Sequence, residues 1–178
     1  AVASLEKEWK RYPILHLDLN IGKYDNPDSL DGMLNRSLEE WENIYGKDKA
    51  EVSLALRFAG VVKRAATATG ERVVILVDEY DKPLLQAIGN EDLQQAFRST
   101  LKPFYGVLKS MDGYIRFALL TGVTKFGKIS VFSDLNNLED ISMREEYADI
   151  CGMSEAELLR DFDEDIRALA LNNGQTYE

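Results

Sequence analysis

Cysteine and histidine are almost missing from this chain of 178 residues, which has one of each, Cys151 and His16. One cysteine cannot form an internal disulfide, and one cysteine with one histidine does not supply the ligands of a zinc site. The chain also lacks any apolar run near the roughly 20 residues that cross a bilayer. We therefore expect no membrane span and a cytoplasmic location.

Positive charge is scarce as well, because 21 Lys and Arg face 31 Asp and Glu, for a net charge of -10. A surface of this sign repels polyanions, so we expect no direct nucleic-acid binding and no attachment to anionic membranes. Proline is limited to four residues, and no linker rich in Pro, Gly or Ser divides the chain. Its length then predicts a single domain over residues 1–178.

A phosphate-binding loop of the form G-x-x-x-x-G-K-[ST] is also absent from the sequence. The stretch from Gly122 to Lys128 comes nearest, but Gly127-Lys128 is followed by Ile129, where a magnesium-binding hydroxyl is required. The backbone cradle and the lysine that grip the β- and γ-phosphates of a nucleotide are therefore not found here.

Three short apolar runs have the character of strands, Tyr12 to Leu19, Val73 to Val77 and Tyr114 to Thr121. The second is apolar throughout, which is typical of a strand covered on both faces. The segments between the runs have helical periodicity. Strands that alternate with helices predict an α/β fold with a parallel sheet and helices on both faces.

Apolar spacing and capping residues place the helices. We expect the first over Leu30 to Tyr45, stopped by Gly46, and a long one over Asn90 to Lys109 with Pro103 inside it. Capping-box pairs mark three further starts. These pairs are Asp48 with Glu51, opening a helix with Val52 and Leu56 on its buried stripe, Ser142 with Glu145, and Ser154 with Glu157, opening a last helix that buries Leu159, Phe162, Ile166 and Leu169.

The most apolar run ends in a group of acids, Asp78, Glu79 and Asp81. Ligands of parallel α/β sheets bind beyond the carboxyl ends of the strands. There, one carboxylate can hold Mg²⁺ while the next orients or deprotonates a water that attacks a phosphate, which is the Walker B chemistry of nucleotide hydrolysis. For Asp78 and Glu79 we favour this interpretation over a merely polar strand end, because adjacent carboxylates repel each other without helping a core. For Asp81 we favour a structural role as the cap of the next helix.

The third run also ends in polar residues, Thr121, Thr124, Lys125 and Lys128. If the strands are parallel, these residues reach the same edge of the sheet as Asp78. A hydroxyl there could sense a terminal phosphate and a lysine could neutralise it. An ordinary polar loop with solvated lysines explains the pattern equally well.

Four stretches together resemble the AAA-ATPase-like family of bacterial P-loop proteins: "YPILHLDL", "VVILVDEYDKPLL", "FALLTGVTKFGKISVFSDLNNLEDISM" and "YADICGMSEAEL". The likeness covers most of the chain, from about Trp9 to Leu158. It implies a P-loop NTPase-like sheet that binds ATP and Mg²⁺, in proteins that often end in a PD-(D/E)XK nuclease-like domain. By this resemblance Asp78 matches the magnesium-associated acid, Glu79 the catalytic acid, and Thr121 or Lys125 the sensor region.

The resemblance also implies an incomplete site, since members carry a P-loop in a segment before the first run. The chain then corresponds to the Walker B and sensor portion, and alone should bind ATP weakly or not at all. Without the P-loop strand, the strand over Phe117 to Thr121 should have an exposed edge, and exposed edges recruit other strands. We expect either that Asn137 to Met143, our candidate for a last strand, fills the gap or that the edge pairs with another chain.

Three functions compete on this sequence. The first is a Mg²⁺-dependent ATPase domain that drives conformational control of an attached effector domain. The second is an NTPase-like scaffold for protein interaction or signalling without hydrolysis. The third, a metal-dependent nuclease using Asp78, Glu79 and Asp81, is disfavoured because acids so close along a strand and turn point in different directions and because the chain is acidic.

Overall fold

The computed structural model describes residues 8–123, 130–132 and 135–176. The chain divides into two compact units, Ala1–Leu138 and Glu139–Glu178. The first unit holds a sheet and its helices, and the second holds short helices. No change of composition marks the boundary in the sequence, which is why the sequence alone predicts one domain. No described helix combines the length and the apolar character that a membrane crossing requires.

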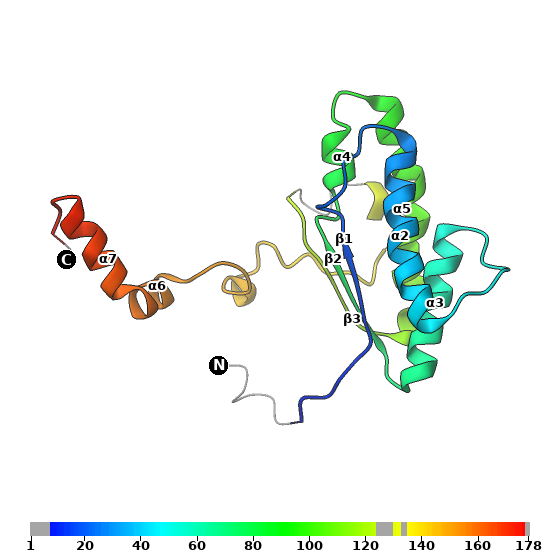
Figure 1. Ribbon diagram of the computed structural model, residues 1–178, viewed down its shortest axis with the longest axis horizontal. Coiled ribbons are helices and arrows are strands. Elements are labelled where there is room, and N and C mark those ends of the chain that lie inside the picture. Colours follow the sequence, from blue (N-terminus) through cyan, green and yellow to red (C-terminus); the bar gives the residue numbers. More distant parts are fainter. Residues whose placement is uncertain (1–7, 124–129, 133–134, 177–178) are drawn as a thin grey trace. The chain divides into compact units, whose positions relative to one another are not determined.

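The sheet of the first unit has three parallel strands in the order β1-β2-β3 (Figure 1). They are β1 (Ile14–Asp18), β2 (Val73–Asp78) and β3 (Ile115–Leu120). The three strands predicted from apolar runs, their parallel arrangement and the α/β class are therefore confirmed. Pairing runs in register from Ile14 with Val74 to Asp18 with Asp78.

Helices cover one face of this sheet. Figure 1 shows α2 (Pro27–Tyr45), α3 (Leu54–Thr69) and α5 (Glu91–Ser110) on the same side. Inward residues of the strands such as Leu15 and Ile75 are at most 1% exposed. Between the helices, Phe58 stacks on Phe104 with ring centroids 4.6 Å apart. This packing buries one continuous apolar core.

The other face of the sheet is open within the described part of the first unit, so the expected helices on both faces are not found there. Ile14 is 57% exposed and Phe117 is 53% exposed on that face. Residues of β2 alternate between buried and half-buried before the exposed Asp78. An all-apolar run such as Val73 to Val77 is therefore not sufficient evidence of two covered faces, because β-branched residues also favour a half-buried strand.

The helix boundaries follow local capping. α2 ends as predicted at Gly46, whose φ of 89° lies in the left-handed region and whose N–H donates to the Glu42 carbonyl at 2.7 Å. The predicted start of α3 at Asp48 is wrong. The Asp48 carboxylate instead accepts from the Ala50 N–H at 2.9 Å in a turn, and Ser53 caps α3 by accepting from the Leu56 N–H at 3.2 Å. Val52 and Leu56, expected on the buried stripe, are 84% and 51% exposed.

α5 begins after Asn90, whose side chain accepts from the Leu93 N–H at 3.1 Å, and it contains Pro103. This helix is confirmed with its buried face. The described part of the first unit also holds three shorter elements: α4 (Lys82–Gln86), η1 (Asp112–Tyr114) and η3 (Ser130–Phe132). The expected last strand over Asn137 to Met143 is wrong, since these residues form no strand and the Asn137 amide donates to the Leu108 carbonyl at 3.2 Å.

The second unit contains η4 (Glu145–Tyr147), α6 (Glu155–Asp161) and α7 (Asp163–Asn172). The capping box of Ser154 and Glu157 is confirmed at the start of α6. The expected helix start at Ser142 is wrong, because its N–H donates to the Asp140 carboxylate at 3.0 Å and only a 3-10 turn follows. The expected burial of the last helix is also wrong, with Leu159, Phe162 and Leu169 exposed by 42%, 42% and 63%.

Candidate functional site

Main-chain hydrogen bonds continue beyond the carboxyl ends of the three strands. The Leu19 N–H donates to the Asp78 carbonyl at 3.0 Å, which joins the segments after β1 and β2. The Thr121 N–H donates to the Val77 carbonyl and the Tyr80 N–H donates to the Thr121 carbonyl, both at 2.9 Å. These hydrogen bonds fix the backbone of the segments that follow the three strands and carry the polar residues.

Asp78 and Thr121 meet at this edge. The Thr121 hydroxyl donates a hydrogen bond to Oδ1 of Asp78. Asp78 is exposed and Thr121 is half-buried, so the carboxylate keeps its access to solvent. The structure thus brings together two of the residues singled out in the sequence. Thr124 and Lys125 lie outside the described residues.

A second carboxylate, Asp18, stands beside Asp78. The two residues are register partners at the ends of β1 and β2, so their side chains leave the sheet on the same face. The Asp18 carboxylate accepts from the Asn20 N–H at 2.7 Å, and the Lys82 ammonium donates to the Asn20 carbonyl at 2.8 Å. Sequence reasoning missed Asp18. The available signal was an acid near the end of "YPILHLDL", the run that precedes β2 in a parallel arrangement.

Glu79 has an unusual backbone, with φ at 56°. Only Gly, and less often Asn or Asp, adopts this left-handed conformation readily. The Glu79 carbonyl accepts from the Lys82 N–H at 3.0 Å and so turns the chain into α4. Its half-buried side chain makes no hydrogen bond or ion pair with the described residues. Strained residues of this kind cluster at functional sites, which makes Glu79 a candidate on structural grounds as well.

Asp81 is fully buried. Its two carboxylate oxygens accept from the Val123 N–H at 3.3 and 3.1 Å. The expectation that the Asp81 side chain caps the next helix is therefore wrong, although the residue occupies the position before α4. Through these hydrogen bonds the Asp81 carboxylate instead links the turn after β2 to the loop after β3. A group buried in this way is not available as the third acid of a nuclease site.

Gly122 lies against this contact. A Cβ atom at Gly122 would come within 2.6 Å of Oδ1 of Asp81 and 2.7 Å of Cε1 of Tyr80. Both neighbours are buried, at 0% and 4% exposure, so neither can move aside freely. The close approach of the two loops at this point requires glycine.

Two buried tyrosines donate hydrogen bonds to the backbone segments that form the site. The Tyr24 hydroxyl donates to the Leu19 carbonyl at 2.9 Å, and the Tyr105 hydroxyl donates to the Tyr80 carbonyl at 3.2 Å. Burial, assisted by the negative charge of Asp18, raises the pKa of Tyr24 to about 12. Burial also raises the pKa of Tyr105 above its ordinary value. Both hydroxyls therefore remain protonated donors that fix the segments after β1 and β2.

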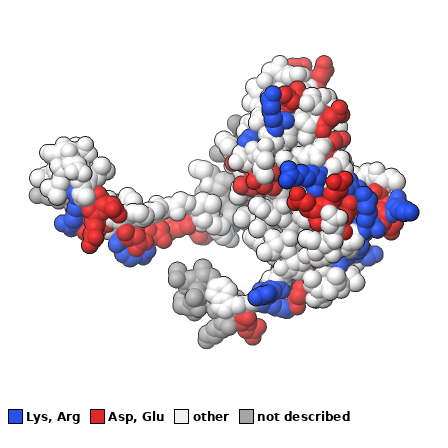
Figure 2. Space-filling model, in the orientation of Figure 1, with Lys and Arg blue, Asp and Glu red and all other residues white. Residues whose placement is uncertain are grey.

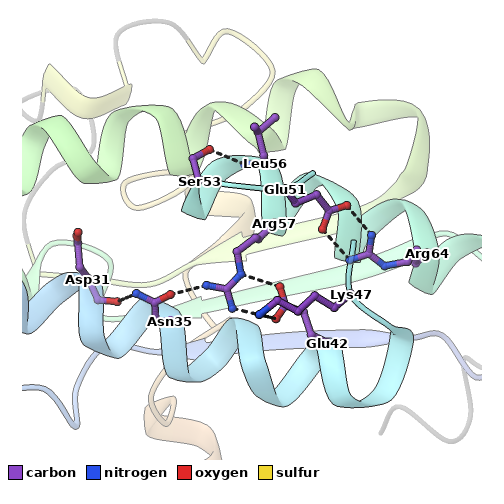
Figure 3. A network of polar contacts seen from close by, with 9 residues as sticks. All are labelled: Asp31, Asn35, Glu42, Lys47, Glu51, Ser53, Leu56, Arg57 and Arg64. Carbon is purple, nitrogen blue, oxygen red and sulfur yellow. Dashed lines mark hydrogen bonds and ion pairs between the residues drawn. The ribbon is translucent and has the colours of Figure 1, made fainter. Parts of the chain in front are cut away.

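A separate polar network joins α2 to α3 (Figure 3). The Arg57 guanidinium donates to both carboxylate oxygens of Glu42 at 2.7 and 2.9 Å, and it also donates to the Asn35 side chain. Hydrogen bonding to Arg57 lowers the pKa of Glu42 from its ordinary value of 4.5, against the opposing effect of burial. Lys47 lies 3.4 Å from the same carboxylate. Because each charge has its partner, this network has a structural role in aligning two helices.

The described residues offer few groups of charged side chains that could bind a metal ion or a polyanion. Among the described residues, no group of three or more His, Cys, Asp or Glu side chains is placed to hold a metal ion. Figure 2 shows that the basic side chains on the face in view stand among acidic ones and form no continuous stripe. The carboxyl edge of the sheet therefore offers a pair of acids and a hydroxyl, which suits a cation shared with a ligand.

The fold and these residues define an α/β protein with acidic and hydroxyl side chains at the carboxyl end of a parallel sheet. A family model described as "Predicted AAA-ATPase" matches residues 1–132, which is more than half of the chain. The chain belongs to this AAA-ATPase-like family, and the description of the family points to nucleotide binding.

One similar protein is the "Uncharacterized protein in vnfD 5'region" of Azotobacter chroococcum mcd 1. The two are 38% identical over 152 residues, which cover 85% of this chain and 30% of the relative. The chain therefore spans less than a third of the length of that relative. No solved structure matches the chain.

Proposed function

We propose that this chain contributes the Walker B and sensor part of a Mg²⁺-dependent ATPase domain. The observation that carries the proposal is the hydrogen bond from the Thr121 hydroxyl to the Asp78 carboxylate at the carboxyl edge of the sheet. A strand-end acid held by a hydroxyl from the neighbouring strand is suited to a hydrated cation next to a phosphate. Membership of a family described as ATPases supports ATP as the nucleotide.

Magnesium fits these residues. Mg²⁺ keeps several waters and is bound in proteins by one or two carboxylates together with substrate phosphates, so it does not need three protein ligands. Asp78, with Asp18 as its register partner, supplies that number. When bound, the ion would neutralise the charge that develops on the phosphate oxygens. Asp78 is the residue that would hold it, with Asp18 beside it.

Glu79 is the proposed catalytic carboxylate, a general base that orients the attacking water and accepts its proton. Its carboxylate is not committed to another described side chain, and its strained backbone fixes the direction in which the side chain leaves the turn. Thr121 and Lys125 are the proposed phosphate-sensing pair. The hydrogen bond between Thr121 and Asp78 would change when Asp78 binds Mg²⁺, so Thr121 would respond to the bound nucleotide. Lys125 would neutralise a phosphate oxygen.

Coupling to an effector domain is the second part of the proposal. The buried Asp81 carboxylate links the turn after β2 to the backbone at Val123, so movement of one loop is transmitted to the other. β3 is an edge of the described sheet, because it pairs with β2 alone. An additional strand from the same protein or from another copy would pair there.

The metal requirement of the full-length gene product tests this proposal. ATP hydrolysis is measured against MgCl₂ concentration for the wild type, for Asp78→Asn and for the control Asp92→Asn, which removes an exposed carboxylate in the first turn of α5. We expect Asp78→Asn to raise the half-saturating magnesium concentration by about tenfold or more, since it removes one charged ligand. The control should match the wild type. An unchanged magnesium profile in Asp78→Asn would contradict the assignment, and absence of turnover in the wild type would favour the non-hydrolysing scaffold.

A further inference from the structure

A basic notch lies at the amino-terminal edge of the sheet, the end opposite to Asp78 and Thr121. It has a volume of about 380 Å³ and is lined by Lys10, Tyr12, Gly70, Glu71, Arg72 and Arg116. Each of the three strands contributes the residues just before or at its start. With β2 six residues long and a rise of about 3.3 Å per residue, the notch is roughly 20 Å from the carboxyl edge. It is therefore a different place from the proposed ATPase site.

A β-bulge aims Arg116 into this notch. Val73 pairs with Ile115 and Val74 pairs with Phe117, so Arg116 is the extra residue between two register pairs. Bulges redirect a side chain out of the regular alternation of a strand. The Arg116 guanidinium lies 6.0 Å from the ring centroid of Tyr12, which precedes β1. Because β2 separates β1 from β3, the Arg116 side chain reaches across the start of β2 to get there.

The charges of the notch are only partly compensated. The Lys10 ammonium is 2.7 Å from the Glu71 carboxylate and 5.8 Å from the Tyr12 ring centroid. The guanidinium groups of Arg72 and Arg116 make no hydrogen bond or ion pair with the described residues. The six lining residues carry three cations and one anion, in a chain whose net charge is -10, and the nearby Glu8 adds a negative charge beside Lys10. Two guanidinium groups with no hydrogen-bond acceptor among the described residues are matched in geometry to phosphoryl or carboxylate oxygens.

We propose that this notch binds a phosphoryl dianion, either free inorganic phosphate or the phosphate group of a monoester. Arg72 and Arg116 donate hydrogen bonds to its oxygens, and Lys10 adds its charge from the flank. Because Lys10 is paired with Glu71, the two arginines supply the uncompensated charge, and their charge of +2 matches a phosphoryl group in its doubly ionised form. The Tyr12 ring, which lies within 6.0 Å of both Lys10 and Arg116, orients Arg116 through a cation–π contact.

Another role of these cations is purely structural. Arg72 follows the end of α3, where the Gly70 N–H donates to the Ala66 carbonyl at 3.0 Å, and cations are favoured near helix carboxyl ends. Arg116 would then only stack on Tyr12. This alternative predicts no saturable anion binding, so a binding experiment separates the two roles.

The experiment is an amide NMR titration of the 178-residue chain with inorganic phosphate and with O-phosphoserine at pH 7.5, with serine as the control and ionic strength held constant with NaCl. We expect saturable shifts at the amides of residues 70–72 and 115–117 with both phosphates and not with serine. Equal affinities would show that free phosphate is sufficient, and tighter binding of O-phosphoserine would point to monoesters. Binding of the monoester should weaken below about pH 6, where the dianion takes up a proton.

Variants with matched charge decide the assignment. Arg72→Gln with Arg116→Gln should lower the affinity by about tenfold or more, because two charge-assisted donors are lost. The control, Arg36→Gln with Arg98→Gln, removes the same charge from α2 and α5 and should bind as the wild type does. Unchanged spectra elsewhere confirm that each variant is folded. Three results would overturn the proposal. They are wild-type shifts that do not saturate, saturable shifts that persist in the Arg72→Gln, Arg116→Gln variant, and an equal loss of phosphate affinity in that variant and in the control.

Discussion

Replacement of Glu79 by glycine should stabilise the protein, although the same change is destabilising at most positions. A side chain at a φ of 56° strains the backbone by about 1–2 kcal/mol, and glycine relieves this strain. Glycine also gives the unfolded chain more freedom, which costs about 0.4–1 kcal/mol of stability. Because the Glu79 side chain makes no described hydrogen bond or ion pair, no further loss is expected. The balance is a gain of about 0.8 kcal/mol, within limits of about 0 and 1.6.

Urea unfolding, followed by circular dichroism and extrapolated to water, measures this change. Glu39→Gly is the matched control, since Glu39 is exposed within α2, where glycine should cost about 1 kcal/mol. Glu79→Gln keeps the strain and should leave the free energy of unfolding unchanged. A loss of stability in Glu79→Gly as large as that in Glu39→Gly would refute the claim that the turn at Glu79 is strained.

Two further substitutions test contacts near the site and in the helix layer. Gly122→Ala should lower the free energy of unfolding by about 1–3 kcal/mol in urea titrations, because its Cβ would overlap Asp81 at 2.6 Å; a neutral effect would mean that the two loops are not held together. Glu42→Ala should lower it by about 3–5 kcal/mol at pH 7, since Arg57 loses its buried partner. The folded-state pKa of Glu42 is depressed, so its contribution is present above the unfolded pKa near 4.5 and is lost as the pH falls through the folded pKa. The difference between Glu42→Ala and the wild type should therefore shrink in acid, and a constant difference from pH 7 to pH 3 would contradict the role of the ion pair.

The strands could be predicted because their apolar runs are short, rich in β-branched residues and bounded by polar ones. Val73 to Val77 illustrates this, since its strand is found where expected. Burial of the second face could not be read from the same run, because apolar composition does not reveal which face a helix occupies. The helix start at Ser53 was missed for a similar reason. Asp48 and Glu51 match a capping box in sequence, yet Asp48 closes a turn by bonding the Ala50 N–H.

At the candidate site, the sequence pointed to Asp78, Glu79 and Thr121 because each follows an apolar run. Their proximity depends on the parallel order of the strands, which alternation with helices predicts. The strain at Glu79 and the contact of Asp81 with Val123 could not be foreseen, because both depend on how two loops meet in space. Asp18 could not be singled out from the sequence, because only the alignment of β1 with β2 places it beside Asp78.

The most direct test of the ATPase proposal is ATP turnover and ATP binding by the full-length gene product, compared between the wild type and Glu79→Gln in the presence of magnesium. The proposed role of Glu79 predicts that turnover falls by about 100-fold or more while binding of ATP persists, because general base catalysis typically contributes 10²–10⁴-fold. Turnover in Glu79→Gln equal to that of the wild type would contradict the role of Glu79 as the catalytic carboxylate.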